Sequence, residues 1–140
     1  SPIQSEGAIS VEAAGCFETP NREDATLRAY NQAGGELFWV RQTIHWCGDG
    51  NRNITSFRPR NIDFQIASWN ILWKYEGVDN DSSREGIYKD GNGEFYEAKT
   101  RIKFEACLTP QIVGLLCDTA FPTFDQIGWP NGRYAGDKYW

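Results

Sequence analysis

The chain has little of what enzymes and metal sites need. Its 140 residues contain one histidine, no methionine and four cysteines, and no two cysteines are spaced as a CxxC pair. Structural zinc sites usually draw their ligands from closely spaced pairs, so this spacing argues against zinc. His45 is the only candidate for a general base near neutral pH, and no nucleophile motif surrounds it. We therefore expect a structural histidine, no cofactor or metal, and no enzymatic activity.

Long apolar runs and an excess of positive charge are also missing. No apolar stretch approaches the roughly 18–20 residues that span a bilayer. Lys and Arg number 14 against 19 Asp and Glu, for a formal net charge of -5. Phosphate backbones are held mainly by Lys and Arg, so nucleic acids and anionic membrane surfaces are disfavoured as partners. The sequence predicts a soluble protein, and its start at Ser1 fits a mature form after removal of a signal peptide or a tag.

The four cysteines favour two disulfides and a secreted protein, because disulfides persist in oxidising compartments. Four cysteines allow three connectivities. We favour Cys107 with Cys117, which closes a short loop, and Cys16 with Cys47, over four free thiols in a cytosolic protein. Asn53 and Asn80 each begin a triplet that fits the glycosylation acceptor pattern.

Period-two alternation dominates the chain and predicts β-strands. From Tyr96 to Ala106, apolar and small side chains alternate with charged ones, as in a half-buried strand. Further strands are expected at residues 37–46, 62–66 and 69–75. Short turn dipeptides separate these runs, for example Asp49-Gly50 and Asn131-Gly132. Helices are considered only for residues 23–30 and 110–116. The sequence thus predicts an all-β fold: an antiparallel β-sandwich, or a small barrel, formed by one domain over residues 16–140.

Residues 1–15 differ from the rest of the chain in having no aromatic residue. Ile9 and Val11 alternate with Ser10 and Glu12, a short strand pattern, and Ile3 adds a further apolar side chain. We predict an extended N-terminal arm that docks on a protein surface. The residues expected to bind the partner are Ile3, Ile9 and Val11.

Aromatic residues make up 14% of the chain, which is high for a small domain. Most of the tryptophans in strands should fill the core, but Trp129 lies in a Gly-Trp-Pro-Asn-Gly turn and Trp140 is the last residue printed. Exposed aromatic planes stack on sugars or anchor protein interfaces. The candidates for such contacts are Trp129, Tyr134 and Trp140.

Carboxylates are numerous enough to lie near one another by chance. Asp49, Asp63 and Glu76 are expected at strand ends or edges, where a catalytic pair could be built, and solvated strand faces are the favoured interpretation. Asp79, Asp81 and Asp90 offer oxygen ligands for calcium in two polar loops, but neither loop matches the EF-hand pattern. Ordinary turn chemistry is favoured for both loops.

Two groups of short motifs carry a family resemblance. The first runs from Trp46-Cys47-Gly48-Asp49-Gly50 to Ile54-Thr55. The second contains Phe104-Glu105-Ala106-Cys107, Cys117 and Asn131-Gly132-Arg133-Tyr134. Together they resemble small secreted actinobacterial proteins of unknown function, over about half of the chain. The resemblance implies a secreted, disulfide-bonded β domain and carries over no catalytic residue.

These features favour a secreted, non-enzymatic interaction or structural subunit of an extracellular assembly. The arm would join a neighbour, either a second copy or another extracellular subunit, by adding a strand to a sheet edge. The alternative is a carbohydrate-binding module that uses exposed Trp and Tyr side chains. A small hydrolase using His45 or a carboxylate pair is the least favoured hypothesis.

Overall fold

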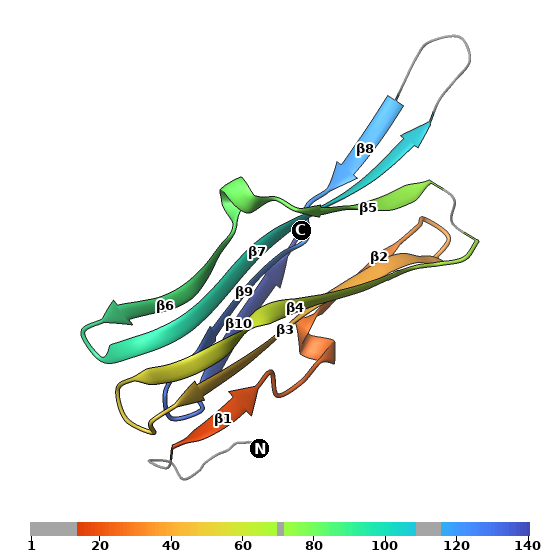
Figure 1. The fold of residues 1–140 in the computed structure, drawn as a ribbon. Coiled ribbons are helices and arrows are strands. Elements are labelled where there is room, and N and C mark those ends of the chain that lie inside the picture. The colour runs from red at the N-terminus through yellow and green to blue at the C-terminus, as the bar shows by residue number, and fades with distance from the viewer. Residues whose placement is uncertain (1–13, 70–71, 109–115) are drawn as a thin grey trace.

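Two antiparallel sheets build the fold in the computed structural model, which describes residues 14–69, 72–108 and 116–140 (Figure 1). The strands of the first sheet are β1 (Gly15–Glu18), β2 (Thr26–Tyr30), β3 (Glu36–Gly48) and β4 (Ile54–Ile66). The strands of the second sheet are β5 (Trp73–Val78), β6 (Arg84–Asp90), β7 (Gly93–Leu108), β8 (Leu116–Ala120), β9 (Thr123–Gly128) and β10 (Tyr134–Tyr139). The predicted all-β fold is confirmed. Within the described residues, no helix has the length and apolar character needed to cross a membrane.

Each sheet is organised around one long strand. Strand β4 pairs with β3 over nearly its whole length, so the two short strands β1 and β2 share the opposite edge of β3. Strand β7 has the same role in the second sheet. Strands β5 and β6 pair with one of its edges, and β8 and β9 pair with the other. Strand β10 pairs with the outer edge of β9. Long central strands let distant segments of the chain meet on one scaffold.

The core lies between β3 and β7. Even-numbered residues of β3 from Phe38 to Trp46 are buried, whereas the odd-numbered ones are partly exposed. In β7 the residues Tyr96, Ala98, Thr100, Ile102 and Phe104 are all completely buried, which confirms the predicted inner face of this strand. The rings of Phe38 and Phe104 stack across the two sheets with centroids 4.0 Å apart. Such aromatic pairs contribute about 0.5–1.5 kcal/mol beyond the area they bury.

A buried polar cluster separates two apolar parts of this core. The Gln42 side-chain amide donates hydrogen bonds to Ala98 O (3.0 Å) and Gln126 Oε1 (2.9 Å), and Thr100 Oγ1 donates to Gln42 Oε1. Gln126 Nε2 donates to Gln42 O and to Tyr134 Oη. The hydrogen bonds of Gln42 cross from the first sheet to the second, so the cluster fixes how the two sheets are positioned relative to each other.

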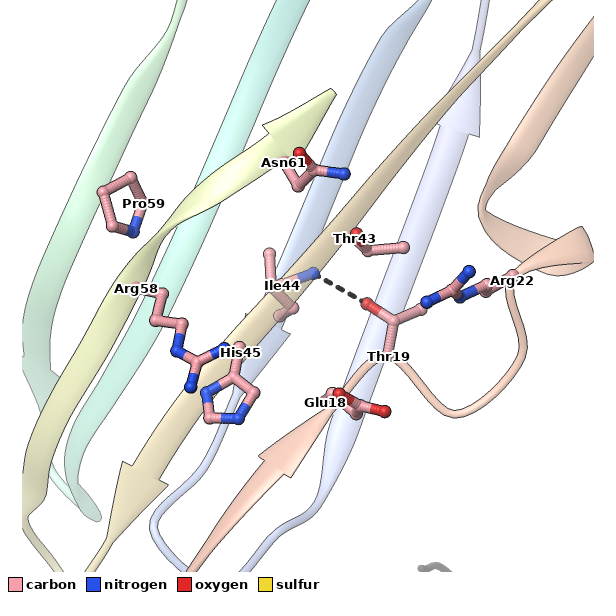
Figure 2. Close-up of a pocket in the computed structure, with 9 residues that line it drawn as sticks. All are labelled: Glu18, Thr19, Arg22, Thr43, Ile44, His45, Arg58, Pro59 and Asn61. Atoms are coloured by element: carbon pink, nitrogen blue, oxygen red, sulfur yellow. Dashed lines mark hydrogen bonds between the residues drawn. The ribbon is translucent and has the colours of Figure 1, made fainter. Parts of the chain in front are cut away.

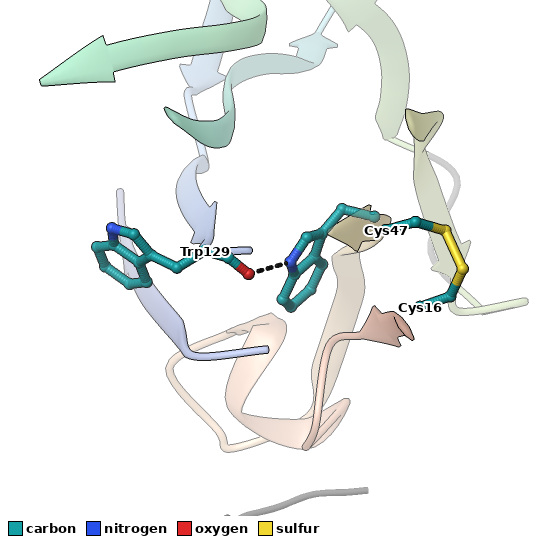
Figure 3. The surroundings of a disulfide bond; sticks show 4 residues. Cys16, Cys47 and Trp129 are labelled. Atoms are coloured by element: carbon teal, nitrogen blue, oxygen red, sulfur yellow. Dashed lines mark hydrogen bonds between the residues drawn. A yellow bond between two sulfur atoms is a disulfide. The ribbon is translucent and has the colours of Figure 1, made fainter. Parts of the chain in front are cut away.

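The disulfides connect neighbouring strands. Cys16 of β1 is bonded to Cys47 of β3, and Cys107 of β7 to Cys117 of β8, which confirms the favoured connectivity. Figure 3 shows the first disulfide near Trp129, whose carbonyl oxygen accepts a 2.8 Å hydrogen bond from Trp46 Nε1. The disulfide and this hydrogen bond together hold β1 and the β9–β10 turn at the same end of β3.

Several expectations from the sequence were wrong. The segment 23–30 forms the short 3-10 helix η1 (Glu23–Ala25) and then strand β2, because Thr26 and Leu27 are buried by pairing with β3. The strand expected at 69–75 begins only at Trp73, and Trp69 lies exposed in a turn. The helix considered for 110–116 falls outside the described residues, apart from Leu116, which starts β8.

Close backbone approach makes Gly48 a sensitive position of the fold. A Cβ atom there would lie 2.4 Å from Pro130 O and 2.5 Å from Pro130 Cα, so backbone atoms would have to move. We expect Gly48→Ala to lower the free energy of unfolding by about 1–3 kcal/mol, the usual cost of overpacking. The matched control is Gly91→Ala, where nothing lies within 4 Å of the new methyl group. Urea unfolding of both variants tests this, and equal midpoints would contradict the steric argument.

Candidate interaction site

Side chains bridge the two sheets along one side of the sandwich. Lys138 of β10 donates hydrogen bonds from its ammonium group to Thr26 O (2.8 Å) and Glu23 O (3.5 Å), on β2 and η1. Unpaired sheet edges attract other strands, and a charged side chain placed across an edge blocks that pairing. The edges of β10 and β2 are therefore protected.

The opposite side of the sandwich is bridged in a similar way. Glu85 of β6 accepts hydrogen bonds from the backbone N–H of Arg60 (2.7 Å), from the Arg60 guanidinium (3.1 Å) and from Tyr96 Oη (2.6 Å). Burial and the neighbouring Glu85 carboxylate raise the pKa of Tyr96 above its usual range, so the phenol stays a donor. Pro59 further lowers the capacity of β4 to pair with another strand, because proline has no backbone N–H.

Within residues 14–69, 72–108 and 116–140, no charged side chain bridges the free edge of strand β8. Among the described residues it pairs with β7 on one side only. Figure 1 shows the β7–β8 hairpin extending past the end of the first sheet. The Cα atoms of Cys107 and Cys117 lie 4.0 Å apart, which is typical of a pair that exchanges no backbone hydrogen bonds. By the alternation of antiparallel ladders, Cys117 and Thr119 direct their N–H and C=O groups to the open side.

An apolar groove lies beside this open edge, at the end of the sandwich where β3 begins. We call it the end groove, and its volume is about 320 Å³. It is lined by Arg28, Ala29, Tyr30, Leu37, Phe38, Trp73, Ala120 and Trp140. Tyr30 and Trp140 are 57% and 52% exposed, and the Trp140 ring packs edge-on against Phe38. Exposed aromatic side chains such as these can anchor a partner, because they bury a large rigid surface on binding.

The topology of the second sheet places the end groove beside strand β8. Strands β8 and β9 follow each other along the same edge of β7, and β10 pairs with β9 but ends at Tyr139. No described strand continues the line of β10 beside β8. A strand added there would pair with β8 and place alternate side chains over the end groove.

The aromatic residues predicted to bind a partner do not lie together in one site. The arm residues Ile3, Ile9 and Val11 lie outside the described residues. Trp129 and Trp140 lie at opposite ends of β10 rather than in one site. The Trp129 ring is covered by the guanidinium of Arg133, 4.7 Å from the ring centroid. Tyr134 packs beside Trp46 inside the sandwich, and burial raises the pKa of its phenol. Of the predicted aromatics, only Trp140 lines the groove.

The polar candidates are explained mainly by structural roles. Asn53 and Asn80 are both exposed, as glycosylation acceptors must be. Asp49 accepts hydrogen bonds from the backbone N–H groups of Asn51 and Asn53, which lower its pKa. Asp63 accepts one from Asn61, and Glu76 lies exposed in β5.

The acidic residues considered for calcium do not form one cluster. Asp79 pairs with Arg101 (3.1 Å), Asp81 lies in the 3-10 helix η2 (Asn80–Ser82), and Asp90 accepts a hydrogen bond in the β6–β7 turn. In the described residues, Glu105, Cys107 and Cys117 have the spacing of a metal site. Both cysteines are in a disulfide, which removes the thiolates that would bind a metal.

The sequence did not reveal a buried carboxylate pair on the outer face of the second sheet. Glu97 of β7 is only 3% exposed, lies beside Asp125 of β9, and is bound by Arg84 of β6. Burial and the Glu97 carboxylate raise the pKa of Asp125 to about 7, while Lys99 and Arg84 oppose this shift. Asp125 Oδ1 is buried and has no donor among the described residues, which fits a carboxyl group that is difficult to ionise. Alternation predicted a solvated Glu97, so no sequence signal pointed to this pair.

Comparisons of the chain with protein-family models, with curated proteins and with solved structures find no match.

The carboxylate pair predicts a dependence of stability on pH. The pKa of Asp125 is higher in the folded than in the unfolded chain, so its contribution to stability is complete below about pH 4. That contribution is lost as the pH rises through about 7 and Asp125 ionises next to Glu97. Asp125→Asn cannot ionise, so we expect the variant to lose less stability than the wild type between pH 5 and pH 8. Thermal unfolding of both proteins at the two pH values tests this, and parallel losses would disprove the pairing.

Proposed function

We propose that this protein is a secreted, non-enzymatic structural subunit whose copies join by β-strand addition. The observation that carries the proposal is the open edge of β8 directly above the end groove, whereas Lys138 bridges β10 to β2 and Glu85 bridges β6 to β4. In strand addition, backbone hydrogen bonds supply general adhesion and alternate side chains supply specificity. The edge of β8 offers the backbone groups, and the end groove offers the contacts for alternate side chains.

The N-terminal arm of a second copy is the proposed occupant of the groove. Ile9 and Val11 alternate with polar residues, as a strand with one apolar face requires. A five-residue strand is enough to match β8, which runs from Leu116 to Ala120.

The arm cannot deliver these side chains to its own groove. Gly15 pairs with Gly48 at the far end of β3, ten residues from Phe38, a distance of about 33 Å at 3.3 Å per residue. The six residue steps from Ile9 to Gly15 span at most about 21 Å when fully extended. The groove of a neighbouring copy has no such restriction, so the arm suits assembly between molecules.

Secretion and the absence of catalysis are part of the same proposal. The two disulfides support an oxidising environment. The Cys107–Cys117 disulfide also ties the two strands of the projecting hairpin together, which stabilises the edge that a partner would bind. A rigid receptor edge lowers the entropic cost of association.

The first test removes the N-terminal arm, the segment proposed to add to β8 of a neighbouring copy. Light scattering should give an assembly for the full chain and a single-chain mass for a chain cut after Ala14. Substituting both Ile9 and Val11 by Ser should have the same effect, because the apolar face of the arm is lost. The matched control changes Ser10 and Glu12 to Ala and should leave the assembly intact. Equal masses for all four proteins would disprove the role of the arm.

The second test blocks the receptor edge. Thr119→Pro removes an N–H group that points away from β7, so the hairpin ladder is kept while pairing with an added strand is prevented. We expect this variant to remain folded by circular dichroism and to lose assembly. If it assembled like the wild type, the arm would bind elsewhere, and Tyr30 and Trp140 would instead be tested for binding to glycans.

A further inference from the structure

A hollow of about 340 Å³ lies on the outer face of the first sheet, where both neighbours of β3 are interrupted (Figure 2). On one side, β1 ends at Glu18 and β2 begins only at Thr26. On the other side β4 bulges, because His45 pairs with Arg58 while Thr43 pairs with Asn61. Bulges often lie next to functional sites, where they redirect side chains. The hollow is therefore a product of strand layout rather than of loose packing.

Two arginines face this hollow without a counter-ion. Arg22 and Arg58 approach it from opposite sides in Figure 2, and neither guanidinium has an ion-pair or hydrogen-bond partner among the described residues. Elsewhere in the protein, Arg28, Arg60 and Arg101 each pair with a carboxylate. An arrangement with two free guanidinium groups favours an anionic ligand.

The remaining lining is polar and suits hydroxyl groups. Thr43 and Asn61 supply a hydroxyl and an amide, and His45 has a buried Nδ1 atom with no hydrogen-bond partner in the described part of the chain. Glu18 is the acidic residue of the lining, and its carboxylate can accept hydrogen bonds from ligand hydroxyls. Ile44 and Pro59 are the apolar residues of the lining, and it contains no Phe, Tyr or Trp.

Size and net charge narrow the class of ligand. The volume is near the lower end of the range of about 300–1,000 Å³ for small-molecule sites. The net charge of -5 repels extended polyanions, so a compact ligand with one negative group is favoured. The planar guanidinium of arginine matches a carboxylate in bidentate geometry. We propose that the hollow binds a small hydroxylated carboxylate, the chemistry of a uronic acid, and that it does so independently of the end groove.

Titration of the isotope-labelled full chain with sodium glucuronate, followed by NMR, tests this proposal. We expect saturable shifts of the amide signals of Thr43, His45 and Asn61, and weaker binding of neutral glucose and of inorganic sulfate. Changing both Arg22 and Arg58 to Gln should raise the Kd for glucuronate about tenfold, since two exposed charge pairs would be lost. Both arginines are exposed and hold no ion pair, so this variant should keep its fold, which near-UV circular dichroism verifies.

Arg52→Gln is the matched control, because Arg52 is an exposed arginine outside the hollow. It should leave the Kd unchanged. An unchanged Kd in the double variant, or glucose binding as tightly as glucuronate, would overturn the proposal. Sulfate binding as tightly as glucuronate would overturn the assignment to a sugar acid, because the hollow would then recognise an isolated anion only.

Discussion

The packing of β3 against β7 is the constraint on which the rest of the structure depends. Phe38 stacks on Phe104 across the sheets, and Gln42 connects to Thr100 and Gln126 at the centre. A purely apolar interface would tolerate sliding of one sheet over the other, whereas buried amides must keep their partners. The polar cluster therefore sets where each end of β7 lies relative to β3. The bridged edges and the end groove follow from that alignment.

The end groove and the hollow around His45 arise from different features of the two sheets. Strand β7 has 16 residues and β3 has 13, and the hairpin formed with β8 extends beyond the first sheet. The end groove lies beside this projecting hairpin, between Ala120 of β8 and Phe38 of β3. The hollow around His45 has another origin, namely the gap between β1 and β2 and the bulge in β4. Phe38 and His45 face opposite sides of the first sheet, so ligands at the two sites would not compete.

The acidic and basic side chains divide into groups that hold the fold and groups that remain available. Glu85 and Lys138 bridge the sheets, and Asp79 pairs with Arg101. Glu97 is buried beside the half-buried Asp125 on the outer face, where burial and the Glu97 carboxylate raise the pKa of Asp125. Among the described residues, Arg22 and Arg58 have no ion-pair partner, and the two side chains line the same hollow.

Several features of this protein follow from local sequence patterns. Alternation from Tyr96 to Ala106 identified a strand and its buried face, and the spacing of the cysteines favoured the observed disulfides. The dipeptides Asp49-Gly50 and Asn131-Gly132 predicted turns. Gly50 and Gly132 adopt positive φ there, a conformation that glycine reaches without steric cost.

Other features were decided only by tertiary structure. Residues 26–30 became a strand because β3 offered an edge to pair with, although the sequence also allowed a helix. The pairing of Glu97 with Asp125, the contact of Trp140 with Phe38 and the opposition of Arg22 and Arg58 all join segments far apart in the chain. Alternation determines which side of a strand a residue occupies. The neighbours it meets there depend on strand order and register, which are set by packing over the whole core.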